Sequence, residues 1–367
     1  MQNILIIAGE VSGDQYASKL AETLKNKDPK ISLHGIGGTQ LKAQTDYFVY
    51  ESAYSHAMGN WEHWKKRRQT KIFLQALEAY LETTPINKAI LIDFQHANFQ
   101  IATILQKYNI PIYTFISPNF WIWKDTRSAQ KIAKYSHTIF TIFEQEYELY
   151  RPLHPRVYYF GHPLLSIRPP MTNPEQTKHR HILTLFPGSR DQEIHYHFPA
   201  MLKAIQILQK NPTTSPIQIA VMNPTIKKLI DHYLKKYPIQ NIQFKDATSP
   251  DLLANTRLLL CVAGTVTLEA LLTYTPMIVL GAVSPITFWL GTHILKVKLP
   301  RIALPNIVMN QTIIPEFIQN FDPTKIAETI TKLDHKMLDH YPEILKKFTK
   351  DPNPFQSIAT ALLKEPS

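Results

Sequence analysis

The sequence predicts an α/β protein of two doubly wound domains, each with a Rossmann-like parallel sheet, facing each other across a cleft. Short apolar segments alternate with helical patterns along most of the chain, which is typical of βαβ units. The alternation restarts after a Pro-rich polar stretch at residues 166–181, which indicates a linker. Each half opens with an apolar strand, a glycine-containing turn and a helix start. The 367 residues suit two domains of about 150–200 residues better than one core.

The expected strands are apolar runs, mostly without polar alternation, as in strands that are buried on both faces of a sheet. In the first half they are residues 3–8, 33–36, 89–92, 112–116, 138–142 and 157–160. In the second half they are residues 182–186, 217–221, 242–244, 258–262 and 277–280. After Pro323 the pattern is helical. We therefore expect domains at residues 1–165 and 166–345, and C-terminal helices at 346–367 that pack back on the first domain.

Composition and charge limit the class of protein. The composition, with 44% hydrophobic and 19% charged residues, is typical of a soluble globular protein. The formal net charge of +11 fits nucleic acid, an anionic membrane surface or phosphorylated substrates, and does not choose among them. The single cysteine, Cys261, lies in an apolar run and is expected to be buried. The chain opens on a strand pattern and no apolar run reaches the roughly 18 residues of a membrane span, so we expect a cytoplasmic protein, soluble or surface-bound.

The stretch ILTLFPGSRDQEI at residues 182–194 predicts an anion site in the second half. The strand ends just before Gly188, and Ser189 with Gln192 three residues later has the form of a capping box. Free backbone N–H groups and the helix dipole at such a turn attract an anion. In the first turn, the positive charge of Arg190 would oppose the helix dipole. Its guanidinium therefore suits another role, such as bidentate hydrogen bonding to a diphosphate. The alternative is an ion pair of Arg190 with Asp191 or Glu193.

The turn GEVSGD at residues 9–14 lacks the third glycine of a dinucleotide fingerprint and the Gly-Lys of a P-loop. Ser12 with Gln15 again has the form of a capping box. Glu10 and Asp14 would repel phosphate, so the hydroxyl groups of a sugar are the better match. The alternative is that both carboxylates merely favour a helix N-terminus.

Asp93 ends the apolar strand AILID at residues 89–93. Because the carboxyl ends of parallel strands face the ligand crevice, Asp93 is placed to act as a general base. A structural aspartate that caps the next element is the alternative.

The segment at residues 56–73 combines tryptophans with basic side chains: Trp61, Trp64, Lys65, Lys66, Arg67 and Arg68. This combination suits contact with lipid headgroups at a membrane. A solvated basic helix face is the alternative. Nucleic acid is not expected as a partner, because no nucleic-acid fold signature accompanies the segment.

Two other segments and two absences bear on function. GTVTLEA at residues 264–270 is a second strand–glycine–helix turn, in which Thr265 and Thr267 offer hydroxyls. Glu269 suits ribose hydroxyls, with dipole compensation as the alternative. In SPNFWIWK at residues 117–124, core packing of the tryptophans is the default and a substrate wall the alternative. Since neither an Asp-x-Asp pair nor an HExxH motif occurs, we expect no catalytic metal.

In this order, the segments resemble the lipid-A-disaccharide synthase family of two-domain GT-B glycosyltransferases. The match runs through most of the chain: AGEVSGD (8–14), GIGG (35–38), MG (58–59), ID (92–93), SPNFWIWK (117–124), FGHPL (160–164), FPGSRDQEI (186–194), GTVTLEA (264–270) and LPNIV…PEFIQ (304–319). Single motifs of this kind are weak, whereas the ordered set at fitting intervals is specific.

The resemblance implies a reaction. A 2,3-diacylglucosamine unit passes with inversion from its UDP derivative to the 6-hydroxyl of 2,3-diacylglucosamine 1-phosphate, giving a β-1,6 disaccharide and UDP. Asp93 would be the base, and Arg190 would stabilise the leaving diphosphate without a metal or cofactor. The implied donor-side residues are Gly188, Ser189, Arg190, Gly264, Thr265, Thr267, Glu269, Asn306, Glu316 and Gln319. The implied acceptor-side residues are Glu10, Ser12, Gly13, Asp14, Asp93 and Asn98.

The resemblance also implies a peripheral position on the inner face of the cytoplasmic membrane, and it leaves a homodimer open. Four positions depart from the family pattern: the family usually has Asp, Phe, Arg and Asp at or near His96, Ala97, Lys124 and Ser166. These departures bear on acceptor identity more than on donor class. The alternatives are a UDP-N-acetylglucosamine epimerase or another GT-B enzyme, and an inactive paralogue that binds a membrane surface.

Overall fold

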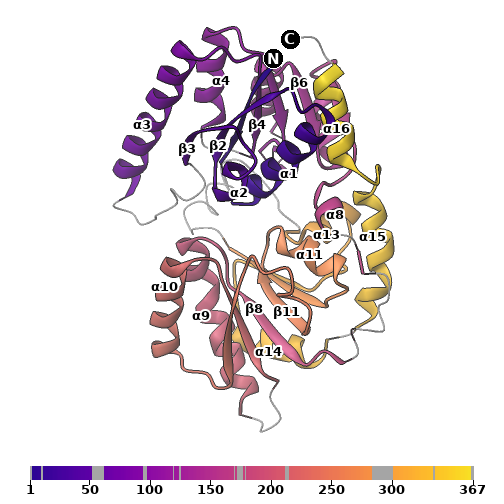
Figure 1. Cartoon of the computed structure of the whole chain (residues 1–367). Helices are drawn as coiled ribbons and strands as arrows, with labels where there is room; N and C mark the ends of the chain where they lie inside the picture. The colour runs from indigo at the N-terminus through magenta and orange to yellow at the C-terminus, as the bar shows by residue number, and fades with distance from the viewer. Residues whose placement is uncertain are drawn as a thin grey trace. The chain divides into compact units, whose positions relative to one another are not determined.

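The computed structural model describes residues 2–9, 11–51, 62–93, 97–118, 120–123, 125–168, 170–171, 177, 179–210, 215–282, 301–333 and 335–364. The chain divides into two compact units (Figure 1). Unit 1 comprises residues 1–167 and 347–367, and unit 2 comprises residues 168–346. Each unit has helices around its own parallel sheet, which confirms the predicted fold class.

The sheet of unit 1 has seven parallel strands in the order β3-β2-β1-β4-β5-β6-β7. The strands are β1 (Asn3–Ala8), β2 (Ser32–Gly37), β3 (Tyr47–Glu51), β4 (Lys88–Ile92), β5 (Ile112–Phe115), β6 (Thr138–Thr141) and β7 (Val157–Tyr159). The helices are α1 (Val11–Lys27), α2 (Thr39–Lys42), α3 (Glu62–Thr83), α4 (Asn98–Lys107), α5 (Phe120–Trp123), α6 (Thr126–Tyr135), α7 (Glu144–Tyr150), α8 (Leu164–Ile167) and α16 (Pro354–Lys364).

Alternate side chains of these strands serve opposite faces of the sheet. Leu5 and Leu91 pack with Leu77 of α3 and Ile101 of α4 in one buried cluster. On the other face lie α1 and α16 (Figure 1). Phe355 of α16 makes an edge contact with Phe115 of β5, and the ring centroids are 6.3 Å apart. The C-terminal helix therefore completes the core of unit 1.

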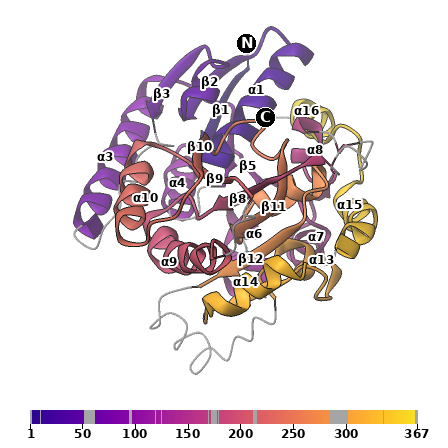
Figure 2. The same ribbon diagram turned by 90° about the horizontal axis from the view of Figure 1, so that it is seen from below.

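The sheet of unit 2 has six parallel strands in the order β10-β9-β8-β11-β12-β13. They are β8 (Ile182–Phe186), β9 (Ile217–Val221), β10 (Ile242–Asp246), β11 (Thr256–Val262), β12 (Met277–Gly281) and β13 (Glu316–Ile318). The helices are α9 (Asp191–Leu208), α10 (Pro224–Lys236), α11 (Val266–Leu272), α13 (Leu304–Met309), α14 (Pro323–Thr331), the 3₁₀ helix η3 (His335–His340) and α15 (Tyr341–Phe348), whose last two residues belong to unit 1. Figure 2 shows α10, α9 and α14 side by side, and their apolar faces share one core with β8 and β11.

Both sheets reverse their strand order at one place. In unit 1 the chain runs outward from β1 to β3 and then returns to place β4 on the other side of β1. In unit 2, β8 and β11 are neighbours in the same way. Ligands of open α/β sheets bind outside the carboxyl ends of the strands at such a switch point. The turns after β1, β4, β8 and β11 are therefore where a ligand is expected.

Among the described helices, none combines the length and the apolar character that a membrane span requires.

Candidate active site

Asp93 directly follows β4, at the switch point of unit 1. It is half-buried and has a left-handed backbone with φ 42°. Its N–H donates a hydrogen bond to the carbonyl of Ile116, after β5, at 3.2 Å. Gly13 of α1 lies against it, since a Cβ built on Gly13 would be 3.5 Å from the Cβ of Asp93. The first turn of α1 and Asp93 therefore meet at one edge of the sheet.

The start of α1 differs from the prediction. The helix begins at Val11, so Ser12 lies within its first turn and the predicted Ser12–Gln15 cap is wrong. The N–H of Gly9 is held by the carbonyl of Ile92 at 3.3 Å, which keeps the turn after β1 short. Glu10 lies outside the described residues.

Asp14 takes the alternative role, at helix N-termini: it lies in the first turn of α1 and bonds the start of α2. Its side chain is 2% exposed, and its carboxylate accepts hydrogen bonds from the backbone N–H groups of Gly38, Gln40 and Leu41 at 2.7, 3.1 and 3.2 Å. These bonds hold the start of α2. A sugar hydroxyl would have to compete with three N–H donors for this carboxylate, so Asp14 shapes the turn and is poorly placed to bind a ligand itself.

Asn98, the first residue of α4, is 1% exposed, and within the part of the chain that the structure describes neither its side-chain oxygen nor its side-chain nitrogen has a hydrogen-bond partner. Buried amides of this kind are nearly always paired, so an unpaired one needs an explanation. His96 lies outside the described residues, and the neighbouring Ala97 is buried. A polar ligand at this edge of the sheet would satisfy the Asn98 amide.

In unit 2 the turn after β8 is formed by Gly188, whose φ of 125° is open to few residues other than glycine. The following helix, α9, has Arg190 as its N-cap, so the predicted Ser189–Gln192 capping box is displaced by one residue. Glu193 takes the place of Gln192, because its carboxylate accepts the N–H groups of Ser189 at 2.7 Å and Arg190 at 3.3 Å. Glu193 therefore already accepts two of the N–H groups that were expected to meet a bound anion, and the anion site stays a prediction.

The Arg190 side chain is half-exposed, and its Nη1 atom lies 3.4 Å from Oε1 of Glu193. The alternative of an ion pair with Glu193 is therefore present in the structure. A long, exposed pair of this kind contributes at most about 1 kcal/mol. The guanidinium carries five N–H donors in a fork, and the contact with Glu193 involves Nη1. Arg190 can therefore keep or exchange this contact when an anion enters the turn.

The turn after β11 contributes hydroxyl groups. Thr265 is the exposed N-cap of α11, and the Thr267 hydroxyl donates to the Gly264 carbonyl at 2.8 Å. A Cβ built on Gly264 would have no atom within 4 Å, so this turn has open space above it. The buried hydroxyl of Thr267 keeps its acceptor lone pairs, whereas the Thr265 side chain faces solvent.

Glu269 of α11 forms an ion pair with Arg168, with 2.6 Å between Oε2 and Nη1. Burial raises the pKa of the Glu269 carboxyl, and the charge of Arg168 and its hydrogen bond act against that rise. Sequence reasoning missed Arg168, because it stands in the polar linker stretch and its partner is far along the chain. A ribose hydroxyl at Glu269 would share this carboxylate with Arg168.

The segment at residues 304–319 uses two of its predicted donor-side residues internally. Asn306 is fully buried; its amide donates to the carbonyl of Ile314 and accepts from Ile313 and Ile314, all at 2.8 Å. Glu316 accepts the N–H groups of Ile302 and Ala303 at 2.9 and 2.8 Å. Both residues therefore shape the chain around them, and Asn306 uses its side-chain oxygen and one amide N–H within its own segment.

Gln319 follows β13 with a left-handed φ of 67°, and its N–H donates to the Gly281 carbonyl at 2.9 Å. It therefore stands at the carboxyl end of the edge strand.

The two tryptophan-containing segments, residues 56–73 and 117–124, lie only partly within the described residues. Trp121 is buried, and its ring lies 4.8 Å from that of Phe143, so it takes the predicted core-packing role. Trp61 and Lys124 lie outside the described residues. For the remaining residues of the basic segment the structure describes only the helical backbone of α3: Trp64, Lys65, Lys66, Arg67 and Arg68.

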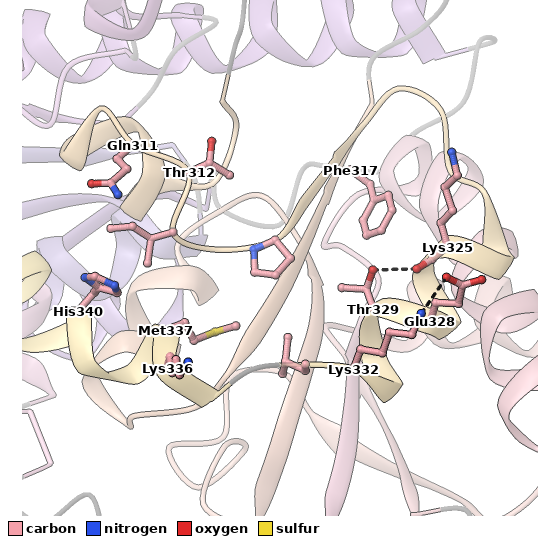
Figure 3. A pocket seen from close by; sticks show the side chains of 13 residues that line it. Gln311, Thr312, Phe317, Lys325, Glu328, Thr329, Lys332, Lys336, Met337 and His340 are labelled. Carbon is pink, nitrogen blue, oxygen red and sulfur yellow. Dashed lines mark hydrogen bonds and ion pairs between the residues drawn. The ribbon is translucent and has the colours of Figure 1, made fainter.

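A hollow of about 740 Å³ lies in unit 2 beside β13, between α14 and η3 (Figure 3). It is lined from the stretch that precedes β13, from β13 itself, from α14 and from η3. Lys332 on its rim pairs with Glu328 at 3.6 Å. None of the predicted site residues lines it.

Within the described ranges, no three His, Cys, Asp or Glu side chains are grouped so that they could hold a metal ion.

Comparison with known proteins gives a consistent answer. The family model described as Lipid-A-disaccharide synthetase matches residues 4–347. The Lipid-A-disaccharide synthase of Coxiella burnetii (strain Dugway 5J108-111) is 30% identical over 342 residues, covering 90% of this chain and 89% of that protein. The one of Syntrophus aciditrophicus (strain SB) is 30% identical over 335 residues, covering 89% and 87%.

The chain belongs to the lipid-A-disaccharide synthase family. Solved structures with the same fold include the S. aureus MnaA-UDP co-structure, with a TM-score of 0.60, 12% identity and coverage of 99% and 95%. Another is Acinetobacter baumannii MurG, with a TM-score of 0.56, 12% identity and full coverage of both chains at 100%. Lipid-A-disaccharide synthases are glycosyltransferases, and the two-domain GT-B fold agrees with that class.

In this member of the lipid-A-disaccharide synthase family, the motif residues lie at the two places where the strand order reverses. Asp93 and Gly13 lie at the β1/β4 switch of unit 1, and Gly188, Arg190 and Gly264 lie at the β8/β11 switch of unit 2.

Proposed function

We propose that this protein is an inverting glycosyltransferase of lipid A biosynthesis. It joins UDP-2,3-diacylglucosamine to 2,3-diacylglucosamine 1-phosphate and forms a β-1,6 disaccharide and UDP. The observation that carries the proposal is the position of Asp93 at the carboxyl end of β4, next to Gly13 of α1, in a chain of this family. A carboxylate at a switch point is placed to meet a substrate hydroxyl.

Asp93 takes the proton of the acceptor 6-hydroxyl as the hydroxyl oxygen attacks the anomeric carbon of the donor. The bond from that carbon to the diphosphate oxygen breaks on the opposite face, so the configuration inverts. The bonding electrons pass to UDP, whose diphosphate gains negative charge. Stabilisation of this charge is the second requirement of the reaction.

Unit 2 supplies that stabilisation. In the turn at Gly188, the Arg190 guanidinium at the start of the 18-residue helix α9 is suited to a diphosphate, and the N–H groups of Ser189 and Arg190 would exchange their contact with Glu193 for that anion. Thr265 and Thr267 supply hydroxyls at the neighbouring turn, and Glu269 and Gln319 complete the donor side. Asn306 and Glu316 support this side by shaping their segment. The proposed chemistry uses no metal and no cofactor, since UDP-sugar is itself a substrate.

Unit 1 binds the acceptor. Asn98 supplies the unpaired buried amide, Ser12 and Gly13 line the turn, and Asp14 holds that turn in place. Both substrates carry acyl chains, so the enzyme must meet them at a lipid surface. The basic segment with Trp61 and Trp64 and the net charge of +11 suit the inner face of the cytoplasmic membrane.

The test is incubation of the purified protein with both diacylated substrates in detergent, followed by mass analysis of the product. We expect a disaccharide 1-phosphate and one UDP per linkage. Asp93→Asn should abolish product while UDP still binds, and Arg190→Ala should nearly abolish turnover with an intact fold. An exposed substitution away from both turns, Lys235→Ala on α10, is the matched control.

Two outcomes would replace the proposal. Release of UDP from UDP-N-acetylglucosamine, with no reaction of its diacylated form, would favour an epimerase or another GT-B enzyme. Absence of turnover with tight binding to anionic vesicles would favour an inactive paralogue.

A further inference from the structure

Glu146 of α7 is a buried carboxyl group outside the proposed reaction centre. Its residue is 1% exposed. Its Oε1 atom accepts the Ser117 hydroxyl at 2.6 Å and the Ser117 N–H at 3.3 Å, and Oε2 accepts the N–H of Ile142 at 2.9 Å. No Lys, Arg or His of the described ranges forms an ion pair with it. Burying a carboxyl group without a cation costs free energy, so we expect Glu146 to have a specific role.

The bonds of Glu146 tie together the ends of two strands. Ser117 follows β5 by two residues, and Ile142 directly follows β6. In the sheet, β5 lies between β4 and β6, so this tie sits next to the strand that carries Asp93. The carboxyl group thus fixes the carboxyl edge of the sheet at the proposed acceptor side.

The residue between β5 and Ser117 makes the connection to Asp93. Ile116 has φ 62°, a left-handed conformation that a β-branched residue adopts only under strain. Its N–H donates to the Phe140 carbonyl at 3.3 Å, and its own carbonyl accepts the Asp93 N–H at 3.2 Å. Since Ser117 is held by Glu146, the direction of the Ile116 carbonyl depends on that contact.

We propose that Glu146 is a positioning residue for Asp93: through Ser117 and the strained Ile116 carbonyl, it fixes the backbone from which the base works. The proposal rests on the proposed function of Asp93 as the general base. A strained backbone at the edge of a reaction site persists only where its surroundings over-determine it, and the Glu146 contacts supply that restraint.

Burial raises the pKa of the Glu146 carboxyl to about 7, while its hydrogen bonds from Ser117 and the backbone N–H groups act against the rise. The ionised form accepts all of these N–H and O–H donors at once, and such charge-assisted bonds are the stronger ones. On protonation, Glu146 becomes a donor to Ser117, whose hydroxyl can turn to the Pro118 carbonyl at 3.2 Å. The restraint on Ser117 is therefore stronger above this pKa.

Five ionisable groups around Glu146 have pKa values that are shifted away from pH 7. Burial raises the pKa values of Tyr135 (α6), Tyr150 (α7) and Tyr159 (β7), and it lowers the pKa of His162 to about 3, so all four stay neutral. Hydrogen bonding at the start of α6 lowers the pKa of Asp125, which stays ionised. The remaining neighbours are Glu144 on the same helix and Lys350, which lies over the Tyr159 ring.

The test is the pH profile of kcat for disaccharide formation at saturating substrates. In the unchanged protein we expect kcat to rise with pH through about 7, as Glu146 ionises. Ser117→Ala should shift this rise to higher pH, because the Ser117 hydrogen bond lowers the Glu146 pKa. Glu146→Gln should remove the rise and lower kcat by about 10-fold or more at pH 8, because a misplaced base is a poor one. KM for the UDP-sugar should stay the same.

Glu148→Gln, at an exposed position of the same helix paired with Arg151, is the control and should leave the profile unchanged. Near-ultraviolet circular dichroism would show whether Glu146→Gln folds, and Ser117→Ala remains decisive if it does not. The inference fails if the profiles of both variants superimpose on that of the unchanged protein. If the unchanged protein forms no disaccharide at all, it is the proposed function that fails.

Discussion

Two buried asparagines at the predicted sites differ in the hydrogen bonds of their side chains. Asn306 uses its side-chain amide in three hydrogen bonds, whereas the Asn98 amide has none with the described residues. Removing a paired buried group leaves its partners unsatisfied, at about 1–3 kcal/mol, while removing an unpaired one costs little. The two residues therefore separate a structural role from a binding role.

We predict that Asn306→Ala lowers the free energy of unfolding by about 1–3 kcal/mol. Asn98→Ala should change it by less than about 1 kcal/mol and raise KM for the acceptor. Urea denaturation and initial rates at varied acceptor concentration measure the two effects. The binding role of Asn98 would be refuted by an unchanged acceptor KM.

Site residues whose position follows from their own strand could be predicted from sequence, whereas roles that depend on partners in other segments could not. The positions of Asp93 and Gly188 follow from a strand that ends in a carboxylate and another that ends before a glycine. The tasks of Asp14 and Glu316 could not be predicted, because both accept backbone N–H groups of other segments, and any residue supplies those. The same holds for Glu146, whose partners Ser117 and Ile142 become neighbours only in the folded sheet.

Among the elements, the two glycine turns of unit 2 differ in the space around them. A Cβ on Gly188 would lie 2.4 Å from the Cβ of Glu193, in a backbone with φ 125° that side chains rarely adopt. A Cβ on Gly264 would meet no atom within 4 Å. The first turn thus depends on glycine for its own shape, while the second has room left for something else.

We predict that Gly188→Ala lowers the stability of the protein by more than about 1 kcal/mol and abolishes UDP binding, because the turn must reshape. Gly264→Ala should fold with unchanged stability yet weaken UDP binding, because the methyl group occupies space that the nucleotide needs. Calorimetric titration with UDP and thermal unfolding measure both. Equal UDP affinity of Gly264→Ala and the unchanged protein would place the nucleotide elsewhere.

The strands show where sequence patterns suffice. All expected strands are present, with ends within two residues of the prediction. The two that were missed, β3 and β13, lie at the edges of their sheets and are half-exposed; β13 has three residues, and β3 is rich in tyrosine, which suits a strand face that is partly open to solvent. Helix starts were less predictable, since α9 begins one residue later than expected, where Glu193 gathers the N–H groups of the turn.

For the whole molecule, the two sheets share one strand order over six strands, with β1 and β8 in corresponding places; β7 of unit 1 has no counterpart in the sheet of unit 2. Each sheet has its own buried core, so each unit has what an independent cooperative transition requires. The C-terminal segment returns to unit 1, where the buried Lys88 ammonium donates to the Leu362 carbonyl of α16 at 2.7 Å. The stability of unit 1 therefore depends on the last helix of the chain.

Two matched substitutions test this division. Phe355 of α16 and Phe198 of α9 are both fully buried, the first in unit 1 and the second in unit 2. Each change to Ala should cost about 3–5 kcal/mol in its own unit. Scanning calorimetry should show two transitions, with Phe355→Ala lowering one and Phe198→Ala the other. UDP should raise only the transition that Phe198→Ala lowers, because ligand binding stabilises the unit that holds the ligand. A single transition, moved alike by both variants and by UDP, would contradict both the division and the assignment of UDP to unit 2.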